Sequence, residues 1–172
     1  GSIVLSGGVI NLETADDGVH ALGDLTLSGG EITIAAGDDA LNARGVLTVA
    51  GGTVDVTRSY EALEASRVSV EQGYVTASAE NNGVSAGEDG FVMTGGLMVL
   101  SASRCVSSDG VFSATGGWLY MSSDGTDVPM AFADGSAAGG SVVLCSATGD
   151  TALLTERGYT YEKDGALWLK TA

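Results

Sequence analysis

The chain has 172 residues, a hydrophobic content of 44%, 27 glycines and one proline. That hydrophobic content argues against disorder, and the single proline excludes a collagen-like chain. The net charge of −15 is the wrong sign for binding nucleic-acid phosphates or an anionic membrane surface. No stretch approaches the ~20 consecutive apolar residues of a membrane span. We therefore expect one domain, no nucleic-acid partner and no membrane insertion.

A repeat of about 22 residues organises the chain. Each clear copy has a short apolar run, a Gly-Gly pair, an alternating run, an acidic pair and a third short apolar run. The Gly-Gly pair or its equivalent returns every 21 to 23 residues, at 7–8, 29–30, 51–52, 72–73, 95–96, 116–117 and 139–140. A repeat of this length predicts a solenoid.

Each copy of the repeat predicts three short strands. In the second copy these are residues 25–27, 32–35 and 40–43, and the middle run alternates with Ile32 and Ile34 on one side and Thr33 on the other. Three short strands per repeat describe one coil of a parallel β-helix, and parallel crossovers are right-handed in most proteins. The sequence therefore predicts an all-β, right-handed parallel β-helix of about seven coils.

The Gly-Gly pairs are expected at corners between strands. A corner needs a residue with positive φ, which only glycine adopts without steric cost. These glycines do not form a phosphate-binding loop, because no helix follows them and no P-loop lysine is present.

The pattern weakens toward the C-terminus. An insertion interrupts the sixth coil around residues 125–129, and the third strand of that coil is hard to identify. Residues 159–172 have the pattern of a hairpin with Lys163, Asp164 and Gly165 at its turn, so we expect β-helix repeats over 1–158 and a capping hairpin over 159–172. Residues 2–8 already match the repeat, so we expect the chain to begin inside the array, as a piece of a longer protein. Cys105 and Cys145 form no metal motif, and a disulfide between them is possible but not expected.

Stacked coils place equivalent residues above one another in columns. Counting a fixed distance from each Gly-Gly pair predicts one column of Asp17, Asp39, Glu61, Asn82 and Cys105, a second of Asp16, Asp38, Tyr60, Asn81 and Arg104, and a third of His20, Asn42, Glu64 and Ser85. Carboxylates about 5 Å apart repel one another, so the stack needs compensating positive charge.

A calcium ion is the natural compensation, because Ca²⁺ binds six to eight oxygens from carboxylates, amides and backbone carbonyls. The predicted ligands are Asp16, Asp17, Asp38, Asp39, Asn42, Glu61 and Glu64. The alternative is that the Asp and Asn residues only form corners, since both tolerate positive φ and bond to their own turns. His20 is expected to be a surface packing residue, and Cys105 to end the site.

The segments ETADDGVHALGDLTLSGGEITI, GDDALNA and SYEALEA resemble a bacterial carbohydrate-binding β-helix family, whose repeats read DDGIHA, LTINGGTI and SYEGLEG. The resemblance covers residues 2–86. It implies a right-handed β-helix similar to polysaccharide lyases, binding of calcium and of acidic plant polysaccharides, and secretion. Asp16, Asp17, Asp38, Asp39, Glu61 and Glu64 fall on the acidic positions of the family. Ala62 stands where the family has glycine, which leaves the conformation of that corner open.

Three functional hypotheses follow. The first is a non-catalytic, extracellular or cell-surface module that binds polysaccharide through bound Ca²⁺. The second is a calcium-dependent polysaccharide lyase, which needs a basic residue near the metal; Arg44, Arg58 and Arg67 are the arginines near the acidic columns. The third is a structural or adhesive stalk, or a filament subunit, that associates end to end.

Overall fold

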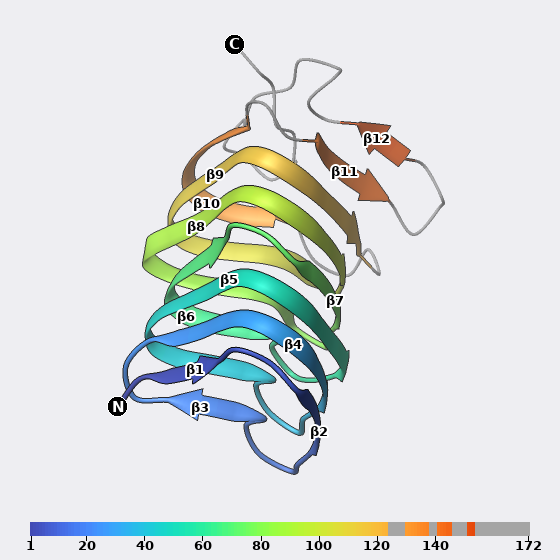
Figure 1. Cartoon of the computed structure of the whole chain (residues 1–172). Coiled ribbons are helices and arrows are strands. Elements are labelled where there is room, and N and C mark those ends of the chain that lie inside the picture. The colour runs from blue at the N-terminus through green and yellow to red at the C-terminus, as the bar shows by residue number, and fades with distance from the viewer. Residues whose placement is uncertain (124–129, 138–140, 146–150, 154–172) are drawn as a thin grey trace.

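The computed structural model describes residues 1–123, 130–137, 141–145 and 151–153, and over these residues the protein is all-β (Figure 1). The described strands are β1 (Ile3–Leu5), β2 (Val9–Glu13), β3 (Val19–Ala21), β4 (Leu25–Ala35), β5 (Leu41–Arg58), β6 (Leu63–Val70), β7 (Tyr74–Ser78), β8 (Asn82–Ser101), β9 (Arg104–Ser122), β10 (Met130–Ala137), β11 (Ser141–Cys145) and β12 (Thr151–Leu153). Within the described ranges no helix has the length and apolar content needed to span a membrane.

The strands wind into a parallel β-solenoid of about five turns (Figure 1). Each turn contributes to three ladders of parallel hydrogen bonds, and the ladders are continuous from turn to turn. We call them the first ladder, before each Gly-Gly corner, the second ladder, after it, and the third ladder, which follows the acidic pair. The parallel solenoid predicted from the repeat is confirmed, whereas its right hand stays a prediction.

Three columns of apolar side chains fill the interior, one from each ladder. Alternation puts every second residue inside, so that Ile32 and Ile34 are buried while Thr33 faces outward, as predicted. The first column is Ile3, Leu25, Leu47, Val68, Phe91 and Phe112; the second is Ile10, Ile32, Val54, Val75, Met98 and Leu119; the third is Val19, Leu41, Leu63, Val84 and Val106. Phe91 and Phe112 stack in the first column with ring centroids 5.4 Å apart.

The second residue of each described Gly-Gly corner has a positive φ, as predicted. The φ angles lie between 80° and 93° at Gly8, Gly30, Gly52, Gly73, Gly96 and Gly117. The corners at Gly8 and Gly73 separate two strands, whereas the other four do not. β4, β5, β8 and β9 each continue through a corner, so the prediction of three separate strands per coil is wrong there. The backbone bends at glycine while the hydrogen-bonded ladder resumes within a few residues, with register shifts at the bend.

The C-terminal part differs from the prediction in two ways. β10 pairs in parallel with β9, with Met130 opposite Val106, so the sixth coil has the third strand that could not be identified from sequence. β11 and β12 then pair antiparallel, with Leu144 opposite Ala152. The predicted hairpin at 159–172 lies outside the described residues, and the predicted count of seven coils is not confirmed.

Glycine at the corners should matter most where turns stack closely. A Cβ at Gly52 would lie 2.7 Å from the carbonyl oxygen of Gly30, whereas a Cβ at Gly8 would meet nothing within 4 Å. We expect Gly8→Ala to cost roughly 1–2 kcal/mol for its left-handed backbone, and Gly52→Ala to cost about 2–5 kcal/mol because a clash is added.

Urea unfolding of both variants checks this expectation. Gly7→Ala is the control, because Gly7 has no positive φ and an open site for Cβ. Equal losses for Gly52→Ala and Gly8→Ala would contradict the close stacking of the corners.

Candidate functional site

The acidic residues lie on the corners that join the second ladder to the third. We call the segments 14–18, 36–40 and 58–62 the acidic corners. They stack through backbone hydrogen bonds, including Gly18 N to Asp39 O (2.8 Å) and Ala40 N to Glu61 O (2.9 Å). Over the described part of the chain no residue other than glycine has a positive φ. The acidic residues therefore do not owe their positions to a left-handed corner conformation, which removes the main reason for the corner-forming alternative.

Ala62 occupies its corner without difficulty. Its side chain is fully buried and its N–H donates to the Asn82 carbonyl at 3.0 Å. The corner conformation that the sequence left open is thus one that alanine adopts.

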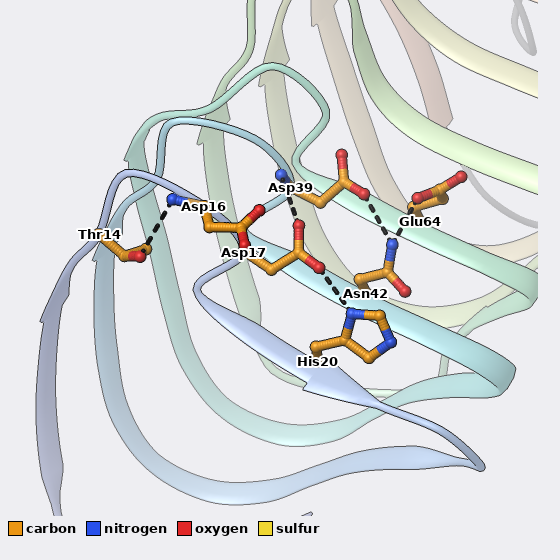
Figure 2. A network of polar contacts seen from close by, with 7 residues as sticks. All are labelled: Thr14, Asp16, Asp17, His20, Asp39, Asn42 and Glu64. Carbon is orange, nitrogen blue, oxygen red and sulfur yellow. Dashed lines mark hydrogen bonds and ion pairs between the residues drawn. The ribbon is translucent and has the colours of Figure 1, made fainter.

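Asp39, Glu61 and Glu64 come together in one group. Each offers a carboxylate oxygen, and these oxygens lie within 4.8 Å of one another. Asp39 is almost completely buried, with 7% of its surface exposed, and the two glutamates are partly buried. Asn42 links the group, because its Nδ2 donates to Asp39 Oδ2 (2.7 Å) and to Glu64 Oε2 (2.6 Å), as Figure 2 shows.

Glu61 is held by the asparagines of the next turn. Asn81 Nδ2 and Asn82 Nδ2 both donate to Glu61 Oε1, at 3.0 Å and 2.7 Å. The other carboxylate oxygen, Glu61 Oε2, is buried and has no hydrogen-bond partner, and the same is true of Asn82 Oδ1. Two buried acceptor oxygens without donors thus lie on two residues that bond to each other, a costly arrangement unless something else satisfies them.

Asp16, Asp17 and Asp38 form a second, more exposed group of carboxylates. Here a histidine bonds to one of the carboxylates: His20 Nδ1 lies 2.6 Å from Asp17 Oδ2, and its ring N–H donates to the carboxylate. Asp17 Oδ1 in turn accepts from the Asp39 backbone N–H at 3.3 Å, which connects the two groups (Figure 2). His20 lies at the surface, as predicted, and it also contacts Asp17, which fixed spacing could not reveal.

Crowding of negative charge changes the acidity of two residues. A hydrogen bond shared with Asp39 raises the pKa of Glu64 to about 8, with burial and the charges of Asp39, Glu61 and Asp17 adding to the effect. The charge of Asp39 likewise raises the pKa of Asp38, followed by desolvation and the charges of Asp17 and Asp16. The protein thus holds a proton on Glu64 at a pH where an ordinary carboxyl is ionised.

The predicted column is correct through Asn82 and wrong beyond it. Asn82 pairs with Arg104, and Cys105 is buried in the core instead of lying in the column. The reason is a shorter corner: Ser78 pairs with Ser101, but Asn82 pairs with Arg104, so one residue is lost between the two pairs. Counting from the Gly-Gly pair could not detect this loss.

A groove of about 670 Å³ runs along the outer side of the third ladder, next to the Asp39–Glu61–Glu64 group. Its polar lining comes mainly from the column His20, Asn42, Glu64, Ser85 and Ser107, with Arg44, Ser66 and Asp109 beside it. Ser66, Ser107 and Asp109 were missed by sequence reasoning, although the outward positions of the third strand would have indicated Ser107.

The three arginines near the acidic columns have different surroundings. Arg44 lines the groove. Arg58 lies with Glu13 in a separate hollow, and Arg67 donates to the Asp89 carbonyl at 3.5 Å. Of these three, Arg44 is the one that lines the groove together with Glu64.

A family model described as "Carbohydrate-binding domain-containing protein" matches residues 1–40. The matched segment includes β1, β2, β3 and β4, and it contains the acidic residues Asp16, Asp17, Asp38 and Asp39. No curated protein and no solved structure matches the chain. The similarity supports the carbohydrate-binding role that the sequence predicts.

The raised pKa of Glu64 gives a stability that depends on pH. A carboxyl whose pKa is higher in the folded than in the unfolded state contributes its full stabilisation of the fold at a pH below its unfolded pKa of 4.5. This stabilisation is lost as the pH rises toward the folded pKa of about 8. In a chelating buffer we expect the wild type to lose about 1–2 kcal/mol of stability between pH 5 and pH 8.5 through this group, after allowance for solvent screening. Glu64→Gln should remove that part of the loss, because the amide keeps a donor to Asp39 and does not ionise.

Urea unfolding at the two pH values measures the difference. Glu31→Gln, at an exposed glutamate on the second ladder, is the control and should keep the wild-type dependence. A pH dependence that is the same in Glu64→Gln as in the wild type would show that Glu64 titrates normally.

Proposed function

We propose that this protein is an extracellular, non-catalytic carbohydrate-binding domain that holds Ca²⁺ at Asp39, Glu61 and Glu64 and binds acidic polysaccharide in the adjacent groove. The carrying observation is that Glu64 belongs to both features: its carboxylate is one of the three clustered ones, and it also lines the groove. The family match over residues 1–40 supports carbohydrate as the class of ligand.

The residues fit a hard cation. Ca²⁺ prefers carboxylate and amide oxygens, and the group offers three carboxylates. One of their oxygens, Glu61 Oε2, is buried and unsatisfied, as is the amide oxygen of Asn82, which bonds to Glu61 through its nitrogen. Asn42 gives its amide nitrogen to Asp39 and Glu64, so it would become a ligand only by turning its amide to present the oxygen. Asp16, Asp17 and Asp38 are the secondary candidates, with one carboxylate already bonded to His20.

A cation would also explain how so acidic a protein binds an acidic ligand. With a net charge of −15 the chain repels a polyuronate unless positive charge is supplied locally. Bound Ca²⁺ would supply that charge and coordinate uronate carboxylates. Around it, Arg44 offers a guanidinium for a second carboxylate, and Ser66 and Ser85 offer hydroxyls for sugar hydroxyl groups.

Calcium binding should stabilise the fold. Binding to the folded state alone adds about 2.7 kcal/mol when Ca²⁺ is at 100 times its Kd, so the melting temperature should rise with Ca²⁺ and fall with chelator. Asp39→Asn and Glu61→Gln should lose this response, and Glu88→Gln, at an exposed glutamate outside both carboxylate groups, should keep it. Calorimetric titration measures Ca²⁺ binding, and thermal unfolding measures the stabilisation. A wild-type melting temperature that is the same in Ca²⁺ and in chelator would refute the calcium site.

Acidic sugar binding should depend on both calcium and the groove. We expect oligogalacturonides to bind in calcium buffer and not in chelator, and Arg44→Ala to weaken binding about tenfold through loss of one charge-assisted contact. Arg58→Ala is the matched control, because Arg58 is also exposed but lies outside the groove. Equal affinity in calcium and chelator would count against the metal bridge.

A polysaccharide lyase is the second candidate, favoured by one observation: Arg44 lies in the groove beside Glu64 and could act as the basic residue that such an enzyme needs. Incubation with polygalacturonate and Ca²⁺, followed by ultraviolet absorbance of an unsaturated product, separates the two functions. An absorbance increase that Arg44→Ala abolishes would replace binding with catalysis.

A further inference from the structure

Aromatic and aliphatic side chains gather on the outside of the second ladder in the later turns. We call this set the aromatic face: Tyr74, Leu97, Val99, Trp118 and Tyr120. Trp118, Tyr74 and Tyr120 leave 44%, 40% and 36% of their surfaces exposed, so several large side chains are exposed together on one ladder. In the second and third turns the same two columns carry Glu31, Thr33, Thr53 and Asp55, so the face is confined to the turns that follow.

The face is built from side chains in fixed positions along the ladder. Tyr74, Leu97 and Trp118 stack in one column, and Val99 and Tyr120 occupy the column two residues further along the strands. The Trp118 and Tyr120 rings are nearly parallel, with centroids 6.0 Å apart and planes inclined by 16°. Beside them lies an apolar hollow of about 340 Å³ lined by Leu97, Val99, Tyr120 and Ser122.

No charge lies on this part of the ladder. From β7 to β9 the outward residues of the second ladder are the aromatic face together with Thr76 and the serine column Ser78, Ser101 and Ser122. In a chain with 22 acidic residues, a surface without any charged side chain stands apart from the rest. It distinguishes the aromatic face from the groove that follows the third ladder, which is lined by the charged residues Arg44, Glu64 and Asp109.

We propose that the aromatic face is a calcium-independent binding site for an extended neutral polysaccharide. Aromatic rings present a negative face that attracts the slightly positive C–H groups of a sugar ring, while serine and threonine hydroxyls bond to its edges. Tyr74 and Trp118 lie in one column two turns apart, a distance of roughly 9.6 Å from the strand spacing. That distance is comparable to one disaccharide unit of an extended β-linked chain, so alternate sugars of a chain lying along the solenoid axis would meet an aromatic ring.

A second copy of the protein fits this face less well. A stable dimer buries about 800 Å² on each partner, and five partly exposed side chains offer only a few hundred Å². Two chains of net charge −15 also repel each other.

The proposal rests on the carbohydrate-binding function and is tested apart from calcium. In chelating buffer, titration with cellohexaose should change the tryptophan fluorescence of the wild type, and calorimetry should give its Kd. Trp118→Ala and Tyr74→Ala should each weaken binding at least tenfold, while Trp118→Phe should retain most of it. Tyr60→Ala, at an exposed tyrosine on an acidic corner, is the control and should bind as the wild type does.

Three outcomes would overturn the proposal. These are no binding of cellohexaose by the wild type, equal binding by a correctly folded Trp118→Ala variant, and a wild-type dimer in analytical ultracentrifugation that Trp118→Ala dissociates. The calcium and oligogalacturonide experiments do not involve this face, so they can fail while cellohexaose still binds, and the reverse also holds.

Discussion

The in-register stacking of one turn on the next is the constraint on which the rest of this structure depends. A parallel ladder repeats each side-chain position about every 22 residues, so a favourable contact is repeated and so is an unfavourable one. The core uses this repetition well, with Leu25 on Leu47 and Phe91 on Phe112. At the acidic corners the repetition is unfavourable, because the same register brings the carboxylates of Asp39, Glu61 and Glu64 together. Core and site are thus two results of one geometry.

The protein relieves the resulting repulsion with neutral groups. Asn42 places an amide N–H₂ between Asp39 and Glu64, asparagines of the next turn hold Glu61, and Glu64 keeps its proton to a higher pH. These devices leave two buried oxygens without partners, on Glu61 and Asn82. Buried oxygen atoms that lack hydrogen-bond donors can bind a cation and would repel an anion.

Much of this could be predicted from sequence, because a repeat reports its own geometry. The Gly-Gly spacing gave the corners, alternation gave the core, and the acidic pairs gave the carboxylate clusters. The predictions that failed were those that depended on a single deviation from the repeat length. The shortened corner after Ser101 moved Arg104 into the place expected for Cys105, and an insertion hid the pairing of Met130 with Val106. His20 was judged as an isolated residue, since a side-chain contact with Asp17 leaves no mark in spacing. The aromatic face was overlooked because its columns are polar in the second and third turns, where the repeat is clearest.

The direction of the ladder hydrogen bonds has a mechanical consequence. The bonds between turns point along the solenoid axis, so tension applied at the two ends loads the turns in series. Such a molecule would lose one turn at a time, beginning with the weakest, at a force independent of the number of turns. A ligand that contacts several turns at once would hold them together against this force. If the chain works under tension at a polysaccharide surface, the adhesive contact itself would then be what makes the domain mechanically strong.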